Sequence, residues 1–336
     1  MKSGFFSSSL WHDRGLLVHG GIENPDCRTP QNTLALLPLK NFNELQVLDK
    51  NGPTLSHHSS CIVTMDSQDI LVLIGGWTGH SRTSQVYAFD LKTKSWIKDL
   101  TENPKGHHRV DPPVGLSGHT ATKINSKLIC VIGREGGIKT QRKFGQMFLL
   151  HLDLKNKFYW YSESPIMPES RSGHTALLSP PVQNMSSLLI FGGRDIDHIF
   201  ICGQWKTDLV ENPPESKAEA KSKLKKITFK RMTKMMGLRY HAMLALTSDC
   251  ILIHGGRHFK AISSKNINDG FFLCSLGKNG EESWIQLDIQ PSIPRFAHTM
   301  CLVNDDIFII GGFSSEDNKE AAKTEKLSLS NFTKND

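Results

Sequence analysis

The sequence predicts an all-β protein, a six-bladed β-propeller whose blades are four-stranded antiparallel sheets. Three observations support this fold class. Six apolar runs end in glycine at a nearly constant interval, a histidine precedes five of these runs, and an aromatic residue follows three of them. A unit of about 56 residues, repeated six times, accounts for nearly the whole chain. One four-stranded sheet cannot bury both of its faces, whereas six sheets packed around an axis can.

The glycine at the end of each apolar run marks the second strand of a unit. Short β-branched and aliphatic runs such as Ile70–Ile74 are typical of buried strands. A glycine pair at the strand end permits positive φ and close approach of a neighbouring backbone. The third unit reads Gly133-Arg134, with Gly136-Gly137 three residues later, so we expect a wider loop there. The glycines that we expect to be structural are Gly20, Gly21, Gly75, Gly76, Gly133, Gly192, Gly193, Gly255, Gly256, Gly311 and Gly312.

A histidine at the start of a strand lies 13 to 18 residues before the glycine in five units. These residues are His58, His119, His174, His241 and His298, whereas the first unit has FFSSS near Phe6. Because they recur once per blade, we expect them to hydrogen-bond the backbone within each blade. The adjacent pairs His57-His58 and His107-His108 suggest a metal site, but neighbouring residues of a strand point to opposite faces, so neither pair is a natural chelate.

The third marker is an aromatic residue in the last strand of a unit. Trp96 and Trp284 are clear examples, and Tyr159 matches Trp96 when Asp153 is aligned with Asp90. Each unit therefore has a histidine strand, a glycine strand, a Tyr/Phe-Asp strand and an aromatic strand. We expect Trp96 and Trp284 to belong to the scaffold.

The fourth unit contains a basic insertion at residues 214–236, which accounts for most of the net charge of +7. Helix formers follow Pro213-Pro214, and the alternation around Ile227 and Phe229 predicts a strand, so we expect a short exposed helix and then the last strand of the blade. The stretch from Lys217 to Lys234 could bind nucleic acid or acidic lipid or act as a nuclear address. A solvated loop is favoured, because no aromatic stacking platform accompanies it.

The two ends of the chain raise the question of how the propeller closes. Residues 1–330 are expected to form one domain with glycine strands ending near 20, 75, 133, 192, 255 and 311, and residues 331–336 a tail. The last unit supplies three strands, and only Met1–Gly4 precedes the FFSSS strand. Either the last blade is incomplete, with three strands, or the chain is a shortened form. Both alternatives predict a weak seam between the ends.

The order of apolar run with glycine pair, Tyr-Asp and tryptophan resembles the kelch repeat, and the resemblance covers essentially the whole chain. It implies a propeller that binds other proteins as a scaffold or adaptor. Several short kelch proteins are substrate receptors of cullin-type ubiquitin ligases, so ligase components are an alternative class of partner. Some larger kelch propellers are copper oxidases that need a tyrosine-rich site. This chain has only four tyrosines, of which Tyr87, Tyr159 and Tyr161 fit blade positions, so the sequence argues against such a site. A metal-dependent oxidase is kept only as the last alternative.

Composition excludes several other classes. No apolar run reaches the 18 or so residues that a membrane span needs, and the N-terminal sequence is a poor signal peptide. Seven cysteines without a CxxC pair are typical of buried thiols in a reducing compartment, so we expect a cytoplasmic or nuclear protein. GxSxG, P-loop, HExxH and GxGxxG motifs are absent. We predict no catalytic residue, cofactor or metal.

Arginine gives the clearest functional signal. In an antiparallel blade, the loop after the glycine strand and the segment before the histidine strand lie at the same edge. Arginines occupy both places, and their guanidinium groups suit carboxylates. We therefore expect one face to bind an acidic or extended segment of another protein. Arginine before the histidine could instead brace adjacent blades. The predicted partner-binding residues are Trp77, His80, Arg82, Arg134, Lys139, Arg142, Lys143, Arg194, Arg257, His258 and Phe313. The arginines before the histidines are Arg109, Arg171, Arg239 and Arg295.

Overall fold

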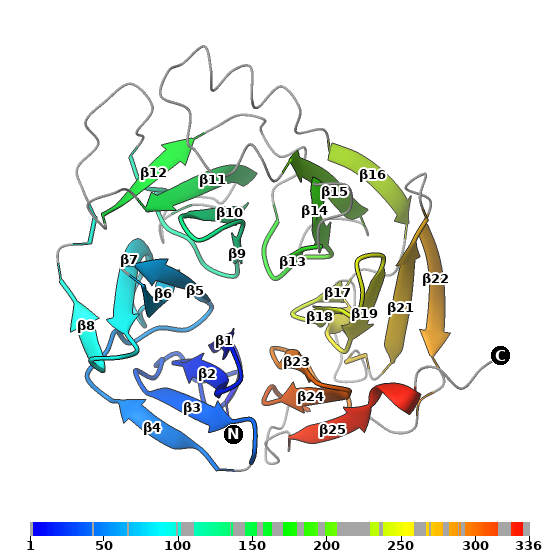
Figure 1. Ribbon diagram of the computed structural model, residues 1–336, viewed down its shortest axis with the longest axis horizontal. Helices are drawn as coiled ribbons and strands as arrows, with labels where there is room; N and C mark the ends of the chain where they lie inside the picture. Colours follow the sequence, from blue (N-terminus) through cyan, green and yellow to red (C-terminus); the bar gives the residue numbers. More distant parts are fainter. Residues whose placement is uncertain are drawn as a thin grey trace.

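The computed structural model is an all-β propeller, with its sheets arranged in a circle around a central axis (Figure 1). It describes residues 3–41, 44–65, 67–98, 100–101, 111–134, 136, 145–152, 157–162, 171–179, 185–193, 199–206, 229–234, 238–258, 267–268, 270–277, 282–287, 289, 293–314 and 324–331. Among these residues, no helix has the length and apolar character that a membrane span requires.

Each of the first three blades is a sheet of four consecutive antiparallel strands. Blade 1 consists of β1 (Ser7–Trp11), β2 (Gly15–His19), β3 (Leu34–Pro38) and β4 (Gln46–Asp49). Blade 2 consists of β5 (Ser59–Met65), β6 (Gln68–Trp77), β7 (Arg82–Asp90) and β8 (Ser95–Ile97). Blade 3 consists of β9 (Thr120–Lys123), β10 (Leu128–Arg134), β11 (Gly145–Leu152) and β12 (Phe158–Ser162).

Blades 4 and 5 repeat this order, and the last sheet is smaller. Blade 4 consists of β13 (Thr175–Leu178), β14 (Met185–Phe191), β15 (Ile199–Lys206) and β16 (Phe229–Lys234). Blade 5 consists of β18 (Ala242–Ala245), β19 (Cys250–His254), β21 (Phe271–Leu276) and β22 (Glu282–Leu287). The last sheet consists of β23 (Thr299–Val303), β24 (Asp306–Ile310) and β25 (Glu325–Ser328), followed by the 3₁₀ turn η3 (Leu329–Asn331). A separate two-stranded sheet pairs β17 (Leu238–Arg239) with β20 (Arg257–His258).

The predicted fold class is thus correct, but the number of complete blades is not six. Five blades have four strands, and the last sheet has three among the described residues. No described N-terminal residue adds a strand to that sheet, because β1 pairs only with β2. The strand predicted at the end of the fourth unit is present as β16, whereas the helix predicted before it and most of the basic insertion lie outside the described residues.

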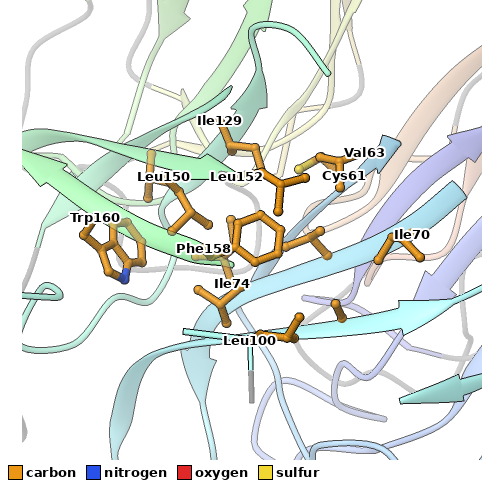
Figure 2. Close-up of a cluster of buried hydrophobic side chains, with 14 of the residues drawn as sticks. Cys61, Val63, Ile70, Ile74, Leu100, Ile129, Leu150, Leu152, Phe158 and Trp160 are labelled. Carbon is orange, nitrogen blue, oxygen red and sulfur yellow. The ribbon is translucent and has the colours of Figure 1, made fainter. Parts of the chain in front are cut away.

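The hydrophobic core lies between blades rather than in one central cluster. Figure 2 shows the part between blades 2 and 3, where Ile74 of β6 and Phe158 of β12 belong to one buried group. Leu150 of β11 and Val72 of β6 are fully buried in the same cluster. Each such side chain contributes about 1.5–3 kcal/mol when it is buried, so packing between neighbouring blades stabilises the propeller.

An inner ring of backbone hydrogen bonds joins the six sheets around the axis. Just before each innermost strand, one residue donates its backbone N–H to the backbone carbonyl of the corresponding residue in the preceding sheet. The N–O distances of these bonds range from 2.7 to 3.2 Å. The last of these bonds runs from Phe5 to Ala297 and closes the circle. We call this set the axial ring. Its members are Phe5, His57, Gly118, Gly173, Tyr240 and Ala297.

The seam between the first and last sheets is sealed by the N-terminal residues. Gly312 donates its amide to the Ser3 carbonyl over 3.0 Å, and the side-chain oxygens of Ser8 and Thr299 are 2.7 Å apart. Phe5 also packs against Phe296 beside the axis, with ring centroids 6.1 Å apart. The closure therefore uses a short strap and side-chain contacts instead of a shared blade. The strength of the seam stays a prediction.

The glycine pair of blade 2 shows why two glycines recur in these repeats. Gly75 has φ +62°, and a Cβ there would lie 2.8 Å from Cε1 of His119 in the next blade. Gly76 has φ +110°, and its Cβ would lie 2.7 Å from Cβ of His58 in its own blade. Gly133 instead continues β10 in regular register with β11. The wider loop predicted after it lies mostly outside the described residues.

Candidate protein-binding face

The loops after the glycine strands meet the segments before the innermost strands, as the sequence predicts. The Gly76 amide donates to the Leu116 carbonyl of the next blade over 2.9 Å, and the Gly256 amide donates to the Arg295 carbonyl over 2.8 Å. These bonds place both sets of segments at one edge of the propeller, which we call the loop face. Blade 3 differs, because there Gly136 donates to the Gly115 carbonyl.

The loop between β6 and β7 contributes Trp77, His80 and Arg82 to the loop face. The indole N–H of Trp77 donates to the backbone carbonyl of Arg28, 3.2 Å away, and fixes this loop against that of blade 1. His80 is exposed. Arg82 is partly buried, and one of its guanidinium N–H groups donates to the Gly136 carbonyl over 3.3 Å. Arg82 thus connects the loops of blades 2 and 3.

Arg28 is a residue of this face that the sequence reasoning missed. It lies in the loop after Gly20-Gly21, the same place in the unit as the predicted arginines, and it is exposed. Its loop also contains the exposed acidic residues Glu23 and Asp26, and the Glu23 carboxylate accepts a hydrogen bond from Gln31 over 2.9 Å. The place of Arg28 within the repeat was the signal that could have identified it.

Arg239 and Arg257 form the second arginine group of the loop face. They are opposite each other in the β17–β20 pair. The guanidinium of Arg257 lies 4.7 Å from the ring centroid of Phe296, and that of Arg239 lies 5.7 Å from the ring of Tyr240. Cation–π contacts of this kind hold an arginine in one orientation. Both side chains are partly exposed.

Arg171 and Arg295 are fully buried and brace the scaffold. Arg171 donates to the Gly192 carbonyl and Arg295 to the Gly311 carbonyl, each over 3.1 Å. Both bonds stay within one blade, whereas the sequence suggested bracing between blades. Arg295 also forms an ion pair with Glu325. Burial lowers the pKa of Arg295 to about 10, so this guanidinium keeps its charge at neutral pH.

Phe313 does not lie on an exposed surface. Its side chain is 3% exposed and packs with Phe296 and Ile22. Its assignment as a surface contact is therefore wrong, because the closure of the propeller buries it. For Arg134 and His258 only the backbone is described, in β10 and β20. The other predicted contacts are outside the described residues: Arg109, Lys139, Arg142, Lys143 and Arg194.

Aromatic residues of the axial ring form the centre of the loop face. The rings of Phe5 and His57 are stacked with centroids 3.9 Å apart. Tyr240 meets Phe5 edge-to-face at 4.8 Å. The face therefore combines an aromatic centre with arginines and Trp77 farther out, which is the residue composition enriched in protein interfaces.

The five axial histidines, His58, His119, His174, His241 and His298, are buried. In four of them, His58, His174, His241 and His298, the Nε2 atom contacts a side chain of the preceding blade, not the backbone of its own blade as expected. The Ser7 hydroxyl lies 2.8 Å from Nε2 of His58, and the Thr175 hydroxyl lies 2.6 Å from Nε2 of His241. The innermost strands lie side by side around the axis (Figure 1). The residue that follows Phe6 or an axial histidine on one of these strands therefore faces the imidazole ring of the axial histidine in the next blade.

Two further histidines were missed by sequence reasoning. His19 and His254 directly precede glycine pairs, and each points its Nδ1 at an axial histidine of the next blade. The distance from His19 Nδ1 to His58 Nε2 is 2.9 Å, and from His254 Nδ1 to His298 Nε2 it is 3.0 Å. Burial lowers the pKa of His19 to about 4 and that of His254 to about 3. The sequence HGG in both units was the available signal.

The other predicted scaffold residues and the cysteines have the following positions. Trp96 packs edge-to-face on Phe89 at 5.0 Å, and Trp284 packs on Phe191 of the neighbouring blade at 5.4 Å. Within the described part of the chain, the cysteines are free thiols and no group of His, Cys, Asp or Glu is arranged to hold a metal ion. Burial raises the pKa of the Cys61 thiol to about 12, which suppresses its reactivity.

The sequence profile of the attractin/LZTR1 β-propeller family matches residues 40–322, and the chain belongs to this family. It is 28% identical over 324 residues to mouse and to human kelch domain-containing protein 9, covering 95% of this chain and 89% of each relative. This confirms the kelch resemblance and the closer likeness to kelch domain-containing protein 9 that GREGG of the third unit indicates.

Two further comparisons cover part of the chain or the fold alone. Kelch domain-containing protein 10 of rat is 29% identical over 121 residues, which are 35% of this chain and 27% of that protein. The solved structure titled "Structure of YjhT" superposes with a TM-score of 0.63 at 14% identity, covering 98% of this chain and 96% of the other. At this identity, the second similarity concerns the fold only.

Proposed function

We propose that this protein is a non-catalytic scaffold or adaptor that binds another protein through the loop face. Kelch-type propellers typically serve as protein-interaction modules, and that class supports the proposal. The observation that carries it is the arrangement of Arg239 and Arg257, which are paired across β17 and β20 and held over aromatic rings.

The geometry favours a partner segment that carries carboxylates. Guanidinium groups bind carboxylates through two parallel hydrogen bonds. Arg82 and Arg257 are held by contacts with the scaffold, so they lose less side-chain entropy when they bind. An acidic, extended segment lying across the aromatic centre could reach both arginine groups. The partner and the subcellular location, expected to be cytoplasm or nucleus, are parts of this proposal.

The test compares partner capture by the wild type with capture by a charge-reversed loop face. The face variant carries Arg28→Glu, Arg82→Glu and Arg257→Glu. The matched control carries Lys92→Glu, Lys94→Glu and Lys123→Glu, which reverse three exposed charges at the opposite edge of blades 2 and 3. Affinity purification with cross-linking mass spectrometry identifies the captured proteins and the segments in contact.

The proposal predicts proteins that the wild type and the lysine control capture equally and the face variant loses at least tenfold. In the wild-type sample, cross-links should join acidic segments of these partner proteins to residues of this chain near Trp77 or Tyr240. Circular dichroism and the thermal midpoint check that the face variant is folded. If the folded face variant keeps every partner, the loop face is not the binding surface.

A further inference from the structure

The last sheet ends in a strand that lacks the usual outer neighbour. In blades 1 to 5 the third strand pairs with a fourth, whereas β25 pairs only with β24 among the described residues. Leu329 donates its backbone N–H to the Asp305 carbonyl over 2.8 Å, on the β24 side. Because backbone groups alternate along a strand, those of Leu327 also point to β24, and those of Lys326 and Ser328 point outward. Within the described chain, β25 therefore has an open edge where the other blades have a fourth strand.

Blade 5 exposes an aliphatic side chain toward this open edge. Ile285 of β22 is opposite Leu273 in the β21–β22 ladder, and Leu273 packs against a buried cluster shared by blade 5 and the last sheet. Opposite residues of a ladder lie on the same face, so Ile285 faces the last sheet. It is nevertheless 55% exposed. The last sheet therefore does not cover the outer strand of blade 5.

Blade 1 exposes aliphatic side chains toward the same edge from the other side. Val47 of β4 is opposite Ala35, which belongs to a buried cluster shared by blade 1 and the last sheet. Val47 is 48% exposed, and Leu45, two residues earlier, is exposed as well. β4 and β22 are the outer strands of the blades on either side of the last sheet (Figure 1). Two apolar surfaces thus flank the open edge of β25.

The complete blades show what covers such side chains elsewhere. The outer strands β8 and β22 contain the same three residues, Ser95–Ile97 and Ser283–Ile285. Ile97 is partly buried, because it packs against a cluster that contains Trp160 of the outer strand of the next blade. Ile285 faces a sheet without a described outer strand and is exposed. The two isoleucines differ in burial because an outer strand covers one of them and not the other.

The same comparison predicts which residues fit the open place. In β8 and β22 the tryptophan faces the preceding blade, since Trp96 packs against a cluster shared with blade 1 and Trp284 packs on Phe191 of blade 4. The isoleucine after it faces the following blade. A strand beside β25 would therefore place an aromatic side chain on Ile285 and the next side chain, an aliphatic one, on Val47.

We propose that an extended segment of another protein completes the last sheet by pairing antiparallel with β25. The segment carries an aromatic residue followed by a β-branched aliphatic residue. In this mode of recognition, backbone hydrogen bonds provide affinity and side-chain pockets provide specificity. Lys326 and Ser328 make the backbone bonds, and the surfaces around Ile285 and Val47 accept the two side chains. The proposal does not rest on the proposed function, because it uses a backbone edge and outer strands instead of the arginine loops.

A peptide copied from blade 2 is the probe. It has the sequence of residues 92–98, KTKSWIK, and carries a fluorescein label. The control peptide, KTKSSSK, has the same charge but serine in place of both apolar residues. Fluorescence anisotropy measures the binding of each peptide to the full chain. The wild type should bind the first peptide at least tenfold more tightly than the second. Absence of saturable binding of the first peptide would overturn the proposal.

Two variants locate the peptide on the chain. Lys326→Pro removes an outward N–H of β25 and spares the bonds to β24, and its control Lys326→Ala loses the same ion pair with Asp306 but keeps the N–H. The second variant combines Val47→Asp with Ile285→Asp. Its control is Val114→Asp, because Val114 is also an exposed aliphatic residue and lies outside the strands. Each variant should bind the peptide at least tenfold more weakly than its control. Undiminished binding by either variant, folded by circular dichroism, would contradict the proposal.

Other occupants of the open place give different results. If a second copy of this chain fills it, sedimentation velocity shows a dimer for the wild type and a monomer for Lys326→Pro. If the end of this chain fills it, the peptide binds only after residues 332–336 are removed. Either result overturns the proposal.

One further variant separates this site from the loop face. The variant with Arg28→Glu, Arg82→Glu and Arg257→Glu should bind the peptide as the wild type does, whether or not it loses its captured proteins. Loss of peptide binding in that variant would place the peptide on the loop face and overturn the proposal.

Discussion

The amide of Phe5 donates a hydrogen bond to the carbonyl of Ala297 over 3.2 Å and so connects the first innermost strand to the last. The ring of Phe5 also stacks on His57 and contacts Tyr240, which lie on two other blades. A residue close to the N-terminus therefore holds together elements from three blades.

Truncating Phe5 should weaken the closure. We expect Phe5→Ala to lower the free energy of unfolding by about 2–3 kcal/mol, because a large aromatic contact in a partly buried place is lost. Leu10→Ala is the control, since Leu10 is 43% exposed and should cost well under 1 kcal/mol or so. Urea unfolding followed by fluorescence measures both. Equal midpoints for the two variants would show that the strap adds nothing to stability.

The first glycine of the pair in blade 2 should not tolerate alanine. Gly75→Ala forces an L-residue to φ +62° and places Cβ against His119 of the next blade. We expect a loss of about 2–4 kcal/mol from the combined backbone and packing strain. Gly270→Ala is the comparison, because its nearest atom would be 3.3 Å away on the Gln286 side chain. Thermal unfolding should separate the two variants clearly; similar melting points would contradict this account of the glycine pair.

Acid should destabilise the protein through its buried histidines. Burial lowers the pKa of His241 from 6.5 to about 3. Between these two values the unfolded chain binds the extra proton, so stability falls as the pH drops from 6.5 towards 3 and is unaffected by this residue above 6.5. At pH 5, this one histidine costs roughly 2 kcal/mol.

The variant His241→Phe isolates that contribution. Its loss of stability between pH 7.5 and pH 5, from urea titrations, should be smaller than that of the wild type by roughly 2 kcal/mol. Leu10→Ala, which changes an exposed side chain and removes no titratable group, should retain the wild-type pH dependence. An unchanged pH dependence in His241→Phe would mean that this imidazole is not held neutral.

Replacing both Arg295 and Glu325 by leucine is expected to cost less stability than replacing Arg295 alone. Leu55, Leu116 and Leu238 occupy the place of Arg295 in other units, three residues before the axial position. Arg295→Leu alone should cost about 3 kcal/mol, because it leaves a largely buried carboxylate unpaired. The double variant with Glu325→Leu should recover at least half of that loss in urea unfolding. Failure to recover would show that the pair has a role beyond local charge balance.

The repeat pattern made the fold predictable, because glycine, histidine and aromatic residues recur for steric reasons. Gly75 must leave room for the ring of His119, and the same demand acts in successive blades. The repeat pattern left the completeness of the last blade open, and the three-stranded sheet of the structure is one of the two alternatives that the sequence offered. The completeness of that blade depends on whether a strand pairs with β25, and such long-range pairing has no local signal.

For the candidate protein-binding face, the sequence predicted where the face lies on the propeller but not which of its residues are exposed. Antiparallel geometry correctly predicted that the loops after the glycine pairs and the segments before the histidines meet. It could not separate the buried Arg295 from the partly exposed Arg257, since burial depends on contacts across blades. Phe313 was misplaced for the same reason, because the seam that covers it involves residues almost 300 positions away, as in the Ser8–Thr299 contact.

In mechanical terms, the axial ring is a hoop. An outward force on one blade is shared by its two neighbours, because every residue of the axial ring donates a backbone hydrogen bond to one neighbour and accepts one from the other. Five of the links are backed by the covalent chain, and the link between Phe5 and Ala297 is the longest and has no such support. The hoop should therefore open at that link first, and separation of the first and last blades should be the earliest step of unfolding under load.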